Sequence, residues 1–399
     1  MKRTLISTAA LLAALASLLY AVGFAITAAA PPYRDAAGYD NYTEKMTGLY
    51  LLKQSAKRDD NLIIYGSSEL RTMEVSTHPS NFFAGKRSGI QVNIIGRGSC
   101  QSLTHAMSIA ASGDALRGKK VVLIASPQSF VPEGIAPDLF MANFSRQQYL
   151  EIMADADITP ELKSSISSRV LELFGQYEAM PESAGIAPDL RRLAEHGAGP
   201  TALTTVRNAA LTPYYAFSRF LYDLKDKVTA REVILSVQSG VTAAINSPID
   251  WEAEERDAIA EAEIMTDNND FGILNDYYTT YIGTRLSRQK DMDANLDYSV
   301  SREYGDLRIL FEICRQKGID PLFIHVPLHG RWSDYTGFTE NRRKAYYDHV
   351  NRIANEYGIQ TLDLTGYEYE DYFLCDIMHL GWKGWLFVDR ALIEYFYSS

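Results

Sequence analysis

Two short segments of the chain contain side chains that could together carry out nucleophilic catalysis. The first is Gly66-Ser67-Ser68, which directly follows a short apolar run, Asn61–Tyr65. A serine at a strand-to-helix turn can project its hydroxyl into a cleft, with backbone N–H groups nearby to hold an oxyanion. Ser67 and Ser68 could equally cap the turn that follows, so this segment alone does not define a site.

The second segment is Asp376-Ile377-Met378-His379, close to the end of the chain. A histidine that acts as base for a serine must be oriented, and its protonated form must be stabilised; a nearby carboxylate does both. Asp376 can reach His379 from within one loop if the segment folds back. Alone, His379 could also be a loop histidine with an ordinary hydrogen bond. Together, the two segments predict a Ser–His–Asp constellation.

The elements that would position these residues alternate between strands and helices. Strand-length apolar runs occur at Asn61–Tyr65, Gln91–Ile95, Lys120–Ala125, Pro321–Val326 and Gln360–Leu364. They are apolar on both faces, which suits the buried strands of a parallel sheet. Helical patterns lie between and after them, at Ser102–Ala111, Val300–Lys317, Asn341–Glu356 and Lys383–Tyr397. This order predicts an α/β fold, a three-layer αβα sandwich with a parallel sheet.

A long stretch, roughly 135–300, separates the two halves of this pattern. It has almost no strand signal and contains helical patterns at Pro160–Ala179, Leu190–His196, Arg207–Leu224 and Trp251–Met265. We interpret it as a helical insertion into one domain that covers residues 33–399.

The N-terminus, residues 1–32, has the pattern of a membrane anchor or signal. Lys2 and Arg3 precede an uncharged, mostly apolar run from Leu5 to Ala30. As a helix this run would be roughly 39 Å long, enough to cross a bilayer core of about 30 Å. The small residues at its end also resemble a cleavage site, so a removed signal peptide stays an alternative. Either reading predicts a domain outside the cytoplasm, and the first predicts a single-pass protein of the cell membrane.

Composition excludes some classes of function. Lys and Arg number 39 and Asp and Glu 50, which gives a formal net charge of −11. Nucleic-acid binding is therefore not expected, because it depends on basic groups that neutralise phosphates. The three cysteines form no CxxC pair, so no metal site is predicted, and at most one disulfide could form.

Together, the Gly-x-Ser turn after the first strand and the Asp-x-x-His before the last helix resemble the SGNH hydrolases. Those enzymes have a flavodoxin-like sandwich and usually begin with Gly-Asp-Ser, where this chain has Gly66-Ser67-Ser68. The resemblance implies that Ser68 is the nucleophile, His379 its base and Asp376 the residue that orients the base. It further implies oxyanion donors at the Ser68 N–H, at a glycine N–H of Gly96 or Gly98, and at the side-chain amide of Gln128.

Further motifs make the chain similar to one family, the DltD family of D-alanyl-lipoteichoic acid transfer proteins. They are Gly66-Ser67-Ser68-Glu69-Leu70, His78–Phe83, Asn93–Gly98, Ser126-Pro127-Gln128, Trp332–Gly337 and Asp376–Trp385, in matching order. The similarity thins over roughly 135–300. The sequence departs from the family pattern at Ser129, where an aromatic residue is expected, and this leaves the shape of the pocket open.

The family resemblance implies an enzyme that transfers D-alanine onto teichoic acid hydroxyls outside the membrane through a serine acyl intermediate, without a cofactor. Its implied partners are a membrane-bound acyltransferase, a D-alanyl carrier system and the teichoic acid polymer. Trp332 and Tyr335, in an expected polar loop, are candidates for polymer contact. His78 and His105 are interpreted as surface or helix-cap residues.

Two alternatives stay open at this point. The same three residues would serve an extracytoplasmic esterase or thioesterase, in which water takes the acyl group. A non-catalytic protein that docks a carrier or polymer could also have this fold, and it would tolerate the loss of Ser68.

Overall fold

A five-stranded parallel sheet forms the centre of the protein, in the order β2-β1-β3-β4-β5. The computed structural model describes residues 14, 17–26, 28, 31–71, 74–85, 88–181, 188–197, 202–237 and 248–398. The strands are β1 (Asn61–Tyr65), β2 (Gln91–Ile95), β3 (Lys120–Ala125), β4 (Asp320–His325) and β5 (Gln360–Asp363). The first three match the predicted ranges, and the last two differ from them by one residue.

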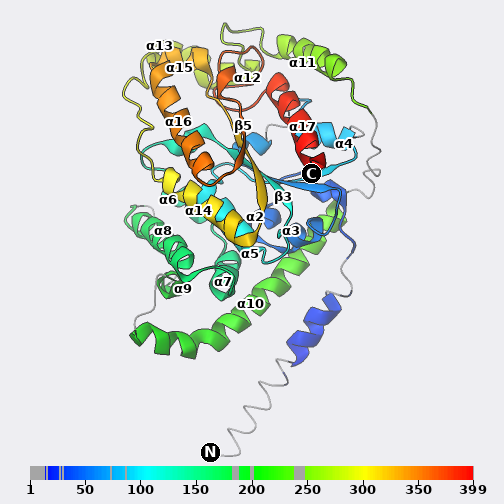
Figure 1. Ribbon diagram of the computed structural model, residues 1–399, viewed down its shortest axis with the longest axis vertical. Coiled ribbons are helices and arrows are strands. Elements are labelled where there is room, and N and C mark those ends of the chain that lie inside the picture. The colour runs from blue at the N-terminus through cyan, green and yellow to red at the C-terminus, as the bar shows by residue number, and fades with distance from the viewer. Residues whose placement is uncertain are drawn as a thin grey trace, which may run out of the picture.

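Successive residues of a strand point to opposite faces of the sheet, so each face presents side chains that must be covered. Helices cover both faces. Ile63 and Leu123 pack with α5 (Ser102–Ala111), α14 (Glu303–Lys317) and α16 (Glu340–Glu356) in one apolar cluster. Ile64 and Val122 pack with α4 (Pro79–Gly85) and α17 (Trp382–Tyr397) in another. Figure 1 shows α14 and α16 on one side of the sheet and α4 and α17 on the other. The protein is therefore an α/β protein with three layers.

The described residues between β3 and β4 contain helices and no strand. These helices are α6 (Pro137–Asn143), α7 (Arg146–Ala154), α8 (Pro160–Glu178), α9 (Pro188–Gly197), α10 (Ala202–Ser236), α11 (Trp251–Met265), α12 (Asn275–Tyr277) and α13 (Leu286–Gln289). The sequence predicted α8, α9 and α11 closely, but it missed α6 and α7 and underestimated α10. The stretch begins and ends at neighbouring strands of the sheet, β3 and β4. That it is an insertion into one domain stays a prediction.

Short helices and turns complete the chain. They are α2 (Thr43–Thr47), α3 (Tyr50–Ser55) and α15 (Gly330–Thr336), 3₁₀ turns at Asp35–Ala37, Ser68–Arg71, Pro127–Phe130, Gly283–Arg285 and Thr365–Tyr367, and a π-helical turn at Tyr278–Ile282. The three cysteines, Cys100, Cys314 and Cys375, are all buried and free.

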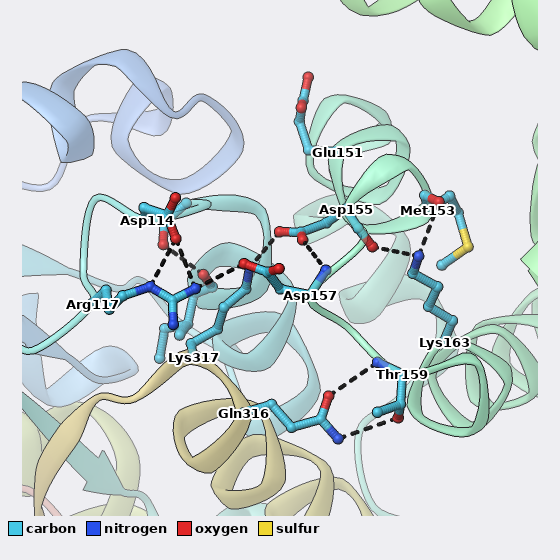
Figure 2. Close-up of polar contacts among 12 residues, drawn as sticks. Asp114, Arg117, Glu151, Met153, Asp155, Asp157, Thr159, Lys163, Gln316 and Lys317 are labelled. Carbon is cyan, nitrogen blue, oxygen red and sulfur yellow. Dashed lines mark hydrogen bonds and ion pairs between the residues drawn. The ribbon is translucent and has the colours of Figure 1, made fainter.

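A polar network fastens the turn between α7 and α8 to the central domain (Figure 2). The ammonium of Lys317, at the end of α14, is buried and pairs with the Asp155 carboxylate. The neighbouring residue, Gln316, exchanges hydrogen bonds with Thr159, four residues after Asp155. Asp157 makes a more exposed ion pair with Arg117 at 2.8 Å. The buried pair is the part of this network that should affect stability most, since exposed pairs contribute little.

We expect Asp155→Asn to lower the free energy of unfolding by about 3 kcal/mol, because it leaves the buried Lys317 ammonium without its counter-charge. Chemical denaturation followed by circular dichroism measures the loss. Asp157→Asn, on the same turn, is the matched control and should leave the denaturation midpoint nearly unchanged. Equal effects of the two substitutions would contradict this account of the network.

The N-terminal anchor predicted for residues 1–32 lies largely outside the described residues. Residues 17–26 are helical, and Leu18, Tyr20 and Phe24 are exposed. Among the helices of the described residues, none is both long enough and apolar enough to span a bilayer.

Candidate active site

The turn that carries Ser68 follows β1 directly and is held by backbone and side-chain contacts. The Gly66 N–H donates to the Ile95 carbonyl oxygen at 3.1 Å, which extends the sheet pairing by one residue. The Ser67 N–H donates to the Glu69 carboxylate at 2.6 Å. This bond folds the chain back on itself and leaves the half-buried Ser68 hydroxyl at the carboxyl edge of the sheet.

Gly96, at the end of β2, lies beneath this turn. A Cβ atom on Gly96 would lie 1.9 Å from the Gly66 carbonyl oxygen, so any side chain there would displace the Ser68 turn. Gly98 is exposed, and a Cβ atom there would meet nothing within 4 Å. No hydrogen bond among the described residues joins either glycine to Ser68. Their part in holding an oxyanion stays a prediction.

The Asp376–His379 segment is a tight loop just before α17. Leu374 and Leu380 form an antiparallel bridge at its base, and the Cys375 N–H donates to the His379 carbonyl oxygen at 2.9 Å. The chain passes so close to α17 that a Cβ atom on Gly384 would lie 2.2 Å from the Phe373 carbonyl oxygen. The loop therefore folds back as the sequence hypothesis required.

The structure brings Ser68, His379 and Asp376 into one hydrogen-bonded chain. Ser68 Oγ and His379 Nε2 are 2.8 Å apart, although 311 residues separate them in sequence. His379 Nδ1 and Asp376 Oδ2 are 2.6 Å apart. The second oxygen of Asp376 accepts the backbone N–H groups of Met378 and His379 at 2.9 and 2.8 Å. This geometry lets His379 accept the Ser68 proton while Asp376 fixes the ring.

The electrostatic environment favours the protonated form of His379 and the ionised form of Asp376. Burial alone lowers the pKa of His379, but the field of the Asp376 carboxylate and its hydrogen bond outweigh burial, so that this pKa is raised. Burial likewise opposes ionisation of Asp376, yet His379 and the two backbone donors bring its pKa below the usual value. Glu69 contributes to the raised pKa of His379. Asp376 is thus ionised at neutral pH and can stabilise an imidazolium.

The Gln128 side chain completes the group around Ser68. Its Nε2 donates to Ser68 Oγ and to Ser126 Oγ, each at 3.2 Å. It comes from the 3₁₀ turn that follows β3, the strand next to β1. Ser129, the departure from the family pattern, lies buried in the same turn. An amide N–H so close to the Ser68 hydroxyl could turn toward an oxyanion if one formed there.

We expect Gln128→Ala to reduce the acyl-transfer rate about 10²–10³-fold without abolishing it, the usual cost of one oxyanion donor. The rate is measured with purified protein and an acyl thioester. Ser126→Ala removes only the second partner of the amide and should change the rate a few-fold at most. Full activity of Gln128→Ala would exclude Gln128 as a donor.

Three other residues singled out in the sequence are buried and contribute to packing or helix capping. His78 is fully buried, and its ring accepts the Ser80 N–H at the start of α4, which is the helix-cap role. His105 is buried within α5 against Tyr65, so the surface or cap interpretation was wrong for it. The segment around Trp332 is helix α15 rather than a polar loop. Trp332 is buried in an apolar cluster with Ile273, so it is not available to a polymer.

Sequence reasoning missed Glu69. Its carboxyl group is buried, one oxygen binds the Ser67 N–H, and the other has no hydrogen-bond partner in the part of the chain that the structure describes. Burial raises the pKa of Glu69. Its place directly after the expected nucleophile was the only sequence signal, and that signal did not reveal that the side chain folds back under the turn.

The fold and site define an α/β protein with a Ser–His–Asp hydrogen-bonded chain at the carboxyl edge of its sheet. Comparison with known proteins then identifies the family: the DltD protein family model matches residues 38–397, and the chain belongs to this family. It is 32% identical to Protein DltD of Bacillus subtilis over 88% of this chain and 86% of that protein. It is 25% identical to Protein DltD of Staphylococcus aureus, over 83% and 80%. The family predicted from the motifs is confirmed.

Proposed function

We propose that the protein transfers D-alanyl groups onto teichoic acid hydroxyls outside the membrane, through an acyl intermediate on Ser68. Membership of the DltD family supports the D-alanyl and teichoic acid part of this proposal. The observation that carries the chemistry is the Ser68–His379–Asp376 hydrogen-bonded chain.

In the first step, Ser68 Oγ attacks the carbonyl carbon of an activated D-alanyl ester or thioester, and its proton passes to His379 Nε2. Asp376 holds the His379 ring and stabilises its positive charge. The Gln128 amide, a backbone N–H of the Ser68 turn and a glycine N–H of the 96–98 loop stabilise the oxyanion. The carbonyl re-forms, the leaving group takes the proton from His379, and D-alanyl-Ser68 results.

In the second step, a hydroxyl of the polymer loses its proton to His379 and attacks the D-alanyl-Ser68 carbonyl carbon. The second tetrahedral state collapses, Ser68 Oγ leaves and regains the proton, and the D-alanyl ester of the polymer is released. Both steps use the same three residues, and no net proton is gained or lost.

The proposed place of action is the outer side of the cell membrane, with the N-terminal run as tether. The exposed stripe of α10 supports this part of the proposal, because Tyr214, Phe217 and Leu221 are all at least 40% exposed. Gly23 of the N-terminal helix lies against the same helix, where an added Cβ would be 3.6 Å from Phe220. Figure 1 shows α10 beside this blue N-terminal helix. The proposed partners are a membrane-bound acyltransferase and the D-alanyl carrier system.

The proposal is tested with the full chain reconstituted in vesicles, a D-alanyl thioester and teichoic acid, by counting alkali-labile D-alanine esters and free D-alanine. Ester formation on the polymer above the no-protein level is the expected result. Free D-alanine alone would identify an esterase or thioesterase instead. In cells, envelope D-alanine esters that persist unchanged after deletion of the gene would contradict the proposed function.

A further inference from the structure

A cavity of about 640 Å³ lies directly beside the proposed catalytic residues. Asp376 and His379 form one wall. Arg71, the last residue of the Ser68 turn, and Glu74 also line it, as does the segment that follows α11, including Asp276 and Tyr277. Ser68 Oγ lies 2.8 Å from His379 Nε2, so an acyl group under attack is next to this cavity.

The segment after α11 is fixed against the Asp376–His379 loop. The Leu274 N–H donates to the Cys375 carbonyl oxygen at 2.8 Å. Burial, and after it the Asp376 carboxylate, raises the pKa of Tyr277, which reflects how close that ring is to the loop. The insertion therefore contributes part of the wall beside the reacting atoms, although it is far from Ser68 in sequence.

The side chains that line the cavity carry an excess of negative charge. Asp376 is neutralised by His379 when the ring is protonated, but Glu74 and Asp276 form no ion pair among the described residues. Arg71 is the cationic side chain of the lining besides His379. Glu74 is close enough to the catalytic loop to add to the raised pKa of Cys375, after burial and Asp376. A phosphodiester polymer would be repelled from these carboxylates, whereas a small cation would be attracted.

Aromatic groups on the same wall suit a cation as well. The rings of Tyr277 and Tyr281 have centroids 4.9 Å apart, and both line the cavity. The face of a tyrosine ring attracts an ammonium group electrostatically. Carboxylates and rings together form a surface that favours a positively charged group close to the acyl carbonyl.

We propose that Glu74 and Asp276 bind the ammonium group of the aminoacyl substrate, so that this cavity selects acyl groups with a positive charge next to the carbonyl. The inference rests on the proposed function and adds the residues that choose the acyl group. It separates the two substrates in space: the aminoacyl group occupies this acidic cavity, and the anionic polymer approaches from another side of Ser68.

The test compares two thioesters that differ only in the ammonium group, D-alanyl- and propionyl-N-acetylcysteamine, with purified full-length protein. We expect kcat/KM to favour the D-alanyl thioester. Asp276→Asn and Glu74→Gln should each reduce kcat/KM for the D-alanyl thioester roughly threefold to fivefold, as for an exposed ion pair, and leave the propionyl thioester unaffected. The preference should also weaken as salt rises, because exposed charges are screened.

Asp270→Asn is the matched control, since it removes an exposed carboxylate from the same segment outside the cavity. Equal losses for both thioesters in Asp276→Asn, or an unchanged preference in both cavity variants, would overturn the inference. A second readout does not depend on turnover: saturation-transfer NMR of D-alaninamide and propionamide with the wild type and the variants. Selective binding of D-alaninamide that is lost in the variants supports the cavity even if no thioester is turned over, which would refute only the proposed function. Equal binding of both amides would overturn the cavity assignment.

Discussion

Ser68→Ala should abolish D-alanyl transfer, with a loss of about 10⁴-fold or more, because no other side chain can form the acyl intermediate at that position. Cells that express this variant in place of the wild type should have the envelope D-alanine ester content of a deletion strain. The protein itself should fold normally, since Ser68 is half-buried and, within the described part of the chain, its hydroxyl bonds to His379 and Gln128 alone.

The neighbouring serine provides a matched control for this experiment. Ser67→Ala removes a buried hydroxyl whose contact is a 3.5 Å bond to the Arg97 carbonyl oxygen, and it keeps the backbone N–H that binds Glu69. This variant should restore the esters at matched protein levels. Mass spectrometry after brief mixing with a D-alanyl thioester should detect an alkali-labile adduct on the wild type and none on Ser68→Ala. Full restoration of the esters by Ser68→Ala would instead identify a docking protein.

Asp376→Asn should lower kcat about 10⁴-fold while the fold is retained. An amide in place of the carboxylate can donate to His379 Nδ1, which favours the ring tautomer whose Nε2 already carries a proton and cannot accept one from Ser68. The substitution also removes the negative charge that raises the pKa of His379.

The pH dependence of the same variant gives a second, independent readout. In the wild type, the rate should rise with pH through the raised pKa of His379, above its ordinary value near 6.5, because the base must be neutral. In Asp376→Asn this acid limb should move to lower pH, since the stabilising charge is gone. Asp371→Asn, which removes an exposed carboxylate four residues before Cys375, is the control. It should leave both the rate and the pH of the acid limb unchanged. A wild-type acid limb in Asp376→Asn would show that Asp376 does not act on the base.

Sequence patterns predicted the limits of an element best where most of its residues are buried. The strands β1, β2 and β3 are buried almost throughout on both faces, and short runs rich in apolar residues therefore mark their limits. Helices α5 and α11 were likewise predicted residue for residue. Short or irregular elements were not: α15 has seven residues, too few to show a period, and the cap that starts it is the ring of His329 accepting the Trp332 N–H. Trp332 therefore seemed to belong to a polar loop, although it is buried.

Local patterns in the sequence predicted the residue types of the candidate site, the order of strands and helices that presents them, and the family. They did so because a turn after a buried strand and a loop before a helix are local features. Tertiary structure alone decided that Ser68 meets His379 across 311 residues, that Gln128 reaches the same hydroxyl, and that Glu69 folds under the turn. It also decided that Asp276, from a stretch without a motif, lines the cavity beside them. These contacts join segments whose distance in space depends on how the whole chain packs, and no local pattern encodes that distance.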